Sequence, residues 1–96
     1  MLYIYPAVVY KQDETEPFVI VMPDVNIVCE GDTVEKALIE AKNQLKIYLQ
    51  CVKRFNANLA SATDFVTFKN KYKDETLLLV ECELDENEGD SITVLF

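Results

Sequence analysis

The side chains that could carry chemistry in this sequence are its carboxylates, because the chain contains 17 aspartates and glutamates and no histidine. Without histidine it lacks the usual general base, the Ser-His and Cys-His nucleophile systems and the commonest zinc ligand. Carboxylates alone can hold Mg²⁺ in a nuclease site, and the candidates are Asp24, Glu30, Asp32, Glu81 and Glu83. Such a site needs acids in the middle of adjacent strands, whereas these fall at expected strand ends and turns. We therefore expect no enzyme, no catalytic residue, no metal and no cofactor.

The stretch Gly31-Asp32-Thr33 could be a phosphate-binding loop or the start of a helix. A phosphate loop uses several glycines and a lysine, and both are missing here. Asp32 and Thr33 are good helix N-caps, and Asp32 with Glu35 has the spacing of a capping box. The stretch therefore predicts a capped helix.

The 17 acidic residues against nine basic ones give a net charge of -8, and the charges are unevenly spread. Residues 1–32 carry six acids and one base, residues 33–73 three acids and eight bases, and residues 74–96 eight acids and no base. This field repels phosphate backbones and favours a basic protein partner. Solubility alone is the plainer explanation of the acidity.

Three cysteines, Cys29, Cys51 and Cys82, lie far apart and form no C-x-x-C pair, so we expect reduced thiols that fill the core of a cytoplasmic protein. The apolar opening of the chain has no basic n-region and contains Pro6 within ten residues. It therefore predicts neither a signal peptide nor a membrane span.

Three segments near the N-terminus have the composition of strands in an antiparallel meander, and a fourth follows later. In the first of them Pro6 must lie at an edge, at a bulge or where the neighbouring strand ends. In the last, Leu78, Val80, Cys82 and Leu84 share one face. The expected strands are 2–10, 18–22, 27–30 and 76–84.

A long amphipathic helix is predicted from Val34 onward, because apolar residues recur there in alternating steps of four and three. The stripe consists of Val34, Leu38, Ala41, Leu45, Tyr48, Val52 and Phe55, widened by Ala37 and Leu49. Residues 63–72 could be a helical turn or an irregular crossing, and Lys69, Lys71 and Lys73 could line an extended segment or a solvated loop. The fold class is α+β: a small antiparallel sheet of three meander strands plus a fourth, with one long helix on one face.

At 96 residues the chain is expected to form a single domain, 1–96, with no separate DNA-binding domain. Its last residues, 91–96, have a strand pattern behind the acidic linker 85–90. This pattern could form a hairpin with the preceding strand or reach a second subunit. We expect a homodimer whose interface includes Ile92, Val94 and Phe96, because an open sheet edge needs cover.

The order of elements and several short motifs resemble the HicB family of bacterial antitoxins. The motifs are Tyr5-Pro-Ala7, Phe18-Val-Ile-Val, Pro23-Asp24, Gly31-Asp-Thr-Val-Glu35 with Ala37-Leu38, Tyr48-Leu49 and Leu79-Val-Glu-Cys-Glu-Leu84. Where the family has Pro-Asp-Leu-Pro-Gly-Cys, this chain reads Pro23-Asp-Val-Asn-Ile-Val28. Many family members continue into a helix-turn-helix or ribbon-helix-helix module, which this chain leaves no room for or does not show, so direct DNA binding is not expected.

The resemblance implies a partial ribonuclease-H-like fold without ribonuclease activity. It also implies a small basic partner, the HicA-type ribonuclease toxin, whose active face the antitoxin covers. The alternative is a self-associating structural or regulatory domain of the same fold without a toxin. For the partner surface we select acids that turns and strand ends can expose: Asp13, Glu14, Glu16, Asp24, Glu30 and Asp32.

Overall fold

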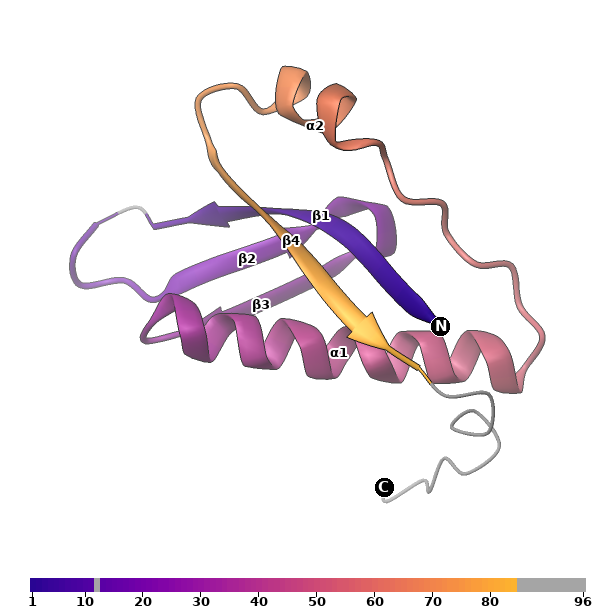
Figure 1. Cartoon of the computed structure of the whole chain (residues 1–96). Helices are drawn as coiled ribbons and strands as arrows, with labels where there is room; N and C mark the ends of the chain where they lie inside the picture. Colours follow the sequence, from indigo (N-terminus) through magenta and orange to yellow (C-terminus); the bar gives the residue numbers. More distant parts are fainter. Residues whose placement is uncertain (12, 85–96) are drawn as a thin grey trace.

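The computed structural model describes residues 1–11 and 13–84, which form an α+β fold with a four-stranded antiparallel sheet (Figure 1). The strands lie in the order β3-β2-β1-β4, so the fourth strand joins the first and not the third. The elements are β1 (Leu2–Tyr10), β2 (Phe18–Met22), the 3-10 turn η1 (Pro23–Val25), β3 (Ile27–Gly31), α1 (Val34–Arg54), α2 (Phe65–Lys71) and β4 (Thr76–Glu83). The predicted meander, long helix and fourth strand are confirmed.

Strand β1 is central, and its middle, from Tyr5 to Val9, is buried on both faces as its composition predicted. Pro6 stands opposite Leu79 of β4, whereas β2 pairs only with Val8 to Tyr10 of β1. The proline therefore lies where the pairing with β2 has ended, which is one of the three positions open to it.

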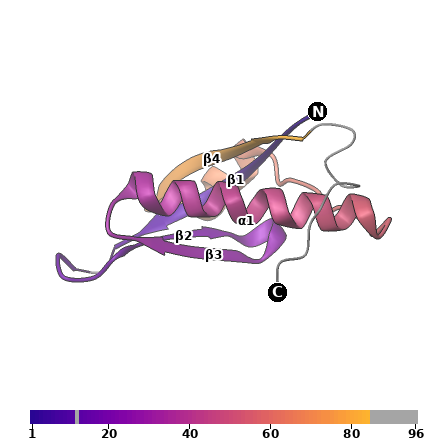
Figure 2. The ribbon, with the colours of Figure 1, turned by 90° about the horizontal axis from the view of Figure 1, so that it is seen from below.

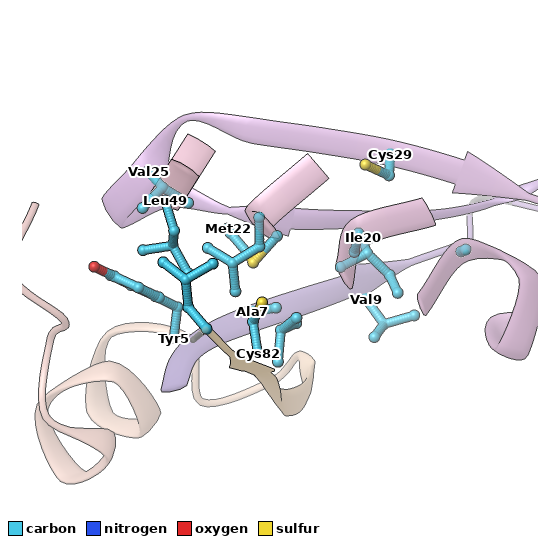
Figure 3. Packing of buried hydrophobic residues seen from close by; sticks show 14 residues of the cluster. Tyr5, Ala7, Val9, Ile20, Met22, Val25, Cys29, Leu49 and Cys82 are labelled. Atoms are coloured by element: carbon cyan, nitrogen blue, oxygen red, sulfur yellow. The ribbon is translucent and has the colours of Figure 1, made fainter. Parts of the chain in front are cut away.

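One face of the sheet packs on α1 and forms the hydrophobic core. Figure 3 shows side chains of this cluster from all four strands beside Leu49 of the helix. The fully buried helix residues are Ala37, Ala41, Leu45 and Leu49, and the two alanines let the helix approach the sheet closely. Phe55 was wrongly assigned to this stripe: it is 72% exposed, because α1 ends at Arg54, beyond the end of the sheet (Figure 1).

The start of α1 is capped by Thr33, whose hydroxyl accepts a hydrogen bond from the Lys36 backbone N–H at 3.1 Å. Thr33 and not Asp32 is therefore the N-cap, so the capping-box spacing of Asp32 and Glu35 is not used. Gly31 precedes it at a very close approach: a Cβ there would lie 2.5 Å from the Ala37 backbone nitrogen. A glycine is thus required at this position because the end of β3 packs closely against the start of α1.

The ambiguous segment 63–72 contains α2, which Asp64 caps by accepting from the Thr67 N–H and hydroxyl. Figures 1 and 2 show α1 and α2 on opposite sides of the sheet. Phe68 of α2 is buried, with only 2% of its surface exposed, beside Tyr72. The lysines Lys69, Lys71 and Lys73 are exposed, and the first two lie in the last turn of α2.

Strand β4 has the predicted facing, since Val80, Cys82 and Leu84 join the core while Glu81 and Glu83 are exposed. Cys29 is also buried, but Cys51 is exposed on α1 and does not fill the core as expected. Within residues 1–11 and 13–84, no helix has the length and apolar character that crossing a bilayer requires. The linker 85–90 and the predicted interface residues Ile92, Val94 and Phe96 lie outside the described residues.

Candidate functional site: an acidic hollow at one end of the sheet

An open hollow of about 570 Å³ lies where the β1–β2 turn meets the start of α1, and we call it the acidic hollow. Its carboxylates come from three places: Glu14 and Glu16 from the turn, Glu30 and Asp32 from the β3–α1 junction, and Glu40 from α1. Lys11 and Lys36 are its cations, and Thr15, Pro17 and Gly31 complete the lining. Five carboxylates against two ammonium groups give the hollow a negative field.

Four of the six acids selected from the sequence meet in this hollow: Glu14, Glu16, Glu30 and Asp32. Sequence reasoning missed Glu40, because an acid on the outer side of a helix carries no signal of its own. The chain brings them together because β2 and β3 form a hairpin whose open end lies beside the β1–β2 turn. The same end of the sheet receives the first turns of α1.

Asp13 is exposed beside the hollow and orders the turn that supplies Glu14 and Glu16. Its Oδ1 accepts a hydrogen bond from the Thr15 N–H at 2.8 Å and another from the Thr15 hydroxyl at 2.6 Å. These bonds to Thr15 hold the pKa of the Asp13 carboxyl below its ordinary value. Asp13 is therefore ionised and adds to the negative field.

Asp24 lies in η1, at the opposite end of β2 from the acidic hollow. Both of its carboxylate oxygens accept hydrogen bonds from Thr63, one from the backbone N–H and one from the hydroxyl, each at 2.7 Å. The structure thus separates Asp24 from the other selected acids and gives its carboxylate a partner within the chain.

The carboxylates that a nuclease site would need are dispersed over the fold. Asp24 lies at one end of the sheet, Glu30 and Asp32 at the other, and Glu83 pairs with the N-terminal amine of Met1 at 3.0 Å. No cluster of three or more histidine, cysteine or acidic residues able to hold a metal ion occurs in the described part of the chain. Within residues 1–11 and 13–84, these carboxylates therefore do not converge on one point.

Two tyrosines act in the scaffold. The Tyr5 hydroxyl donates to the Ala60 carbonyl at 2.6 Å, and the Tyr48 hydroxyl accepts from the Ala60 N–H at 3.0 Å. Burial, with the nearby Tyr48, raises the pKa of Tyr5. These bonds fasten the irregular segment between α1 and α2 to the core.

The fold and the hollow together define a small α+β protein with an acidic surface at one end of its sheet. No protein-family model and no curated protein matches the sequence.

Solved structures identify the fold as that of HicB antitoxins. The Burkholderia pseudomallei antitoxin HicB superposes with a TM-score of 0.72 at 16% identity, over 98% of this chain and 72% of that one. A chain of a toxin–antitoxin complex from Streptococcus pneumoniae gives 0.70 at 20% identity, over 100% and 82%. A chain of a HicA3 and HicB3 toxin–antitoxin complex gives 0.58 at 22% identity, over 86% and 99%. The HicB-like fold that the motifs suggested is therefore confirmed.

Proposed function

We propose that this chain is an antitoxin-like binding protein that neutralises a small basic ribonuclease of the HicA type by covering its RNA-binding face. The observation that carries the proposal is the HicB-like fold over nearly the whole chain. Two of the similar structures are of toxin–antitoxin complexes. The acidic hollow adds support from chemistry, because its carboxylates resemble the phosphates that an RNA-binding face accepts.

The contacts proposed for the toxin are Glu14, Glu16, Glu30 and Asp32, with Asp13 beside them. Charged groups of this kind raise the rate of encounter with a basic partner and discriminate against acidic ones. Inhibition then requires only that the toxin's RNA site be occupied, so the chain needs no catalytic residue of its own. Asp24 is left out of this surface, because Thr63 engages its carboxylate.

Purification of the tagged chain from its native host, with identification of what copurifies, tests the proposal. We expect a basic protein of under about 100 residues, the small end of single domains, whose ribonuclease activity the chain suppresses. Two results together would contradict the proposal: no such protein copurifies, and the chain does not reduce the ribonuclease activity of a small basic protein encoded by a neighbouring open reading frame.

A charge-reversed variant locates the contact surface. Glu14, Glu16, Glu30 and Asp32 changed to lysine should slow association with the toxin and reduce its dependence on salt, because screening acts on such exposed charges. Two variants with the same change of charge separate the hollow from net charge: one reverses Glu14 and Glu16, and the other reverses Glu35 and Glu81, which are exposed and line neither this hollow nor the one beside Asp74 and Glu75. If both variants slow association equally, net charge and not the hollow determines the association rate, and the hollow is not part of the interface.

The alternative function, self-association without a toxin, is favoured by the edge position of β4. This strand has no hydrogen-bonded neighbour on its outer side among the described residues, and an open edge invites pairing. We propose that residues 91–96 pair across a two-fold axis, with Ile92, Val94 and Phe96 buried in a homodimer. Sedimentation of the chain lacking residues 91–96 tests this: a dimer unchanged at micromolar concentration would exclude that interface.

A further inference from the structure

A second, smaller hollow of about 330 Å³ adjoins the acidic hollow, and we call it the aromatic hollow. Phe18 lines it with Tyr10, Asp74 and Glu75, and its remaining lining residues are Val9, Lys11, Val34 and Thr76. Lys11 lines both hollows and so stands between them.

The ammonium group of Lys11 lies over the ring of Phe18, with its Nζ 4.3 Å from the ring centre. Among residues 1–11 and 13–84, Lys11 makes no ion pair with a carboxylate, although five acids line one hollow and two the other. A lysine surrounded by acids thus rests on an aromatic face. The aromatic hollow is therefore a place where a cation is favoured by the ring quadrupole and by the surrounding charge together.

An arginine from outside would suit this place better than Lys11 does. A guanidinium is planar, stacks on aromatic rings and is more weakly hydrated than an ammonium group, so it gives up less on leaving water. Its fixed fork of donors also suits a carboxylate, and Asp74 and Glu75 line the same hollow as Phe18.

We propose that the aromatic hollow docks an arginine side chain of the basic partner and that Lys11 is an internal stand-in which this arginine displaces. The identity of the partner as a basic protein rests on the proposed function, whereas the site rests on Phe18 and its surroundings. Lys11 loses little when displaced, because it also lines the acidic hollow, where Glu14, Glu16 and Glu30 can accept its charge.

The test uses a fluorescein-labelled tri-arginine peptide with the full chain at low salt, measured by anisotropy and by the NMR shifts of the Phe18 ring. Lys11→Gln should tighten binding, because it removes both a repelling charge and the competitor for the ring. Lys36→Gln is the matched control, since it removes the same charge from the lining of the acidic hollow without touching Phe18. We expect the Lys11→Gln variant to bind the peptide about two- to fivefold more tightly than the Lys36→Gln variant does, which is the range of a surface cation–π contact.

Phe18→Leu supplies the second arm, with folding checked by circular dichroism. It should weaken peptide binding about two- to fivefold, and in its background Lys11→Gln should tighten binding no more than Lys36→Gln does. Equal effects of the two lysine substitutions with Phe18 present, or Phe18 ring shifts that do not move on titration, would overturn the proposal. Peptide binding does not depend on which host protein is the partner, so its failure is distinguishable from a failed copurification.

Discussion

Both carboxylate oxygens of Asp24 are hydrogen-bonded to Thr63, which lies 39 residues further along the chain. The pair joins η1, at the end of β2, to the last residues before α2. Together with the bonds of Tyr5 and Tyr48 to Ala60, it fixes an irregular segment that leads from one side of the sheet to the other. Asp24, which we selected from the sequence for the partner surface, thus makes hydrogen bonds within the fold.

Removing this tie should destabilise the protein. Asp24→Asn removes the negative charge that strengthens both bonds, and Thr63→Val removes the hydroxyl donor, so each should lower the free energy of unfolding by about 1 to 3 kcal/mol. The double substitution should cost less than the sum, because both remove the same interaction. Urea unfolding measures these values, and Asp32→Asn, an exposed acid, is the control. Fully additive losses would show that the pair is not coupled.

Gly31→Ala should destabilise the junction of β3 and α1. The added Cβ would meet the backbone nitrogen of Ala37 at 2.5 Å, and backbone cannot move aside as the end of a flexible side chain can. We expect a loss of about 1 to 3 kcal/mol, the usual cost of overpacking. Thermal and denaturant unfolding measure it, and a loss below about 0.5 kcal/mol, typical of surface changes, would mean that the helix start is not held so close to the strand.

Leu45→Ala should leave a cavity between α1 and the sheet, because Leu45 is fully buried. The expected loss is about 2 to 5 kcal/mol in the free energy of unfolding. Ile47→Ala, two residues along the same helix but 55% exposed, is the matched control and should stay within about 0.5 kcal/mol. Similar losses at both positions would contradict the assigned buried face of the helix.

The cap of α2 should weaken in acid. Hydrogen bonds from Thr67 hold the pKa of the Asp64 carboxyl below its ordinary value of 3.8. A lowered folded-state pKa means that the carboxylate stabilises the helix start above the ordinary pKa and loses this effect as the pH falls through the lowered value. The Thr67 amide shift, followed by NMR, should therefore titrate below pH 3.8. Asp64→Asn, which also caps helices, should abolish that titration; a midpoint at or above 3.8 in the unsubstituted chain would contradict the cap.

Periodic elements of this fold could be predicted closely because burial alone determines their patterns. Alternation in the strands and steps of three and four in the helix gave β1, β2, α1 and the facing of β4 to within a residue or two. Phe55 shows the limit, since the helical pattern continues past the point where the sheet stops offering a surface. The sequence pattern indicates which face of the helix is apolar, but only the tertiary structure shows where the sheet that buries this face ends.

The acidic hollow was partly predictable, because turns and strand ends expose acids. Glu14, Glu16, Glu30 and Asp32 were found on that ground. Asp24 satisfies the same rule but is engaged by Thr63, a residue whose position depends on the whole crossing segment. Glu40 and the contact of Lys11 with Phe18 arise from the meeting of separate elements, for which a single sequence has no local signal.

The pairing of β1 with β4 also sets the order in which the protein can be completed during synthesis. Leu2 of β1 stands opposite Glu83 of β4, so β1, the first strand to be synthesised, cannot complete its pairing until β4 has been synthesised. Until then the nascent chain can form the hairpins of β1, β2 and β3 and the helix α1, with one side of β1 unpaired between Leu2 and Val9. Such an edge is prone to join other chains. The interval between synthesis of α1 and synthesis of β4 is therefore the period in which this protein is most exposed to misassembly.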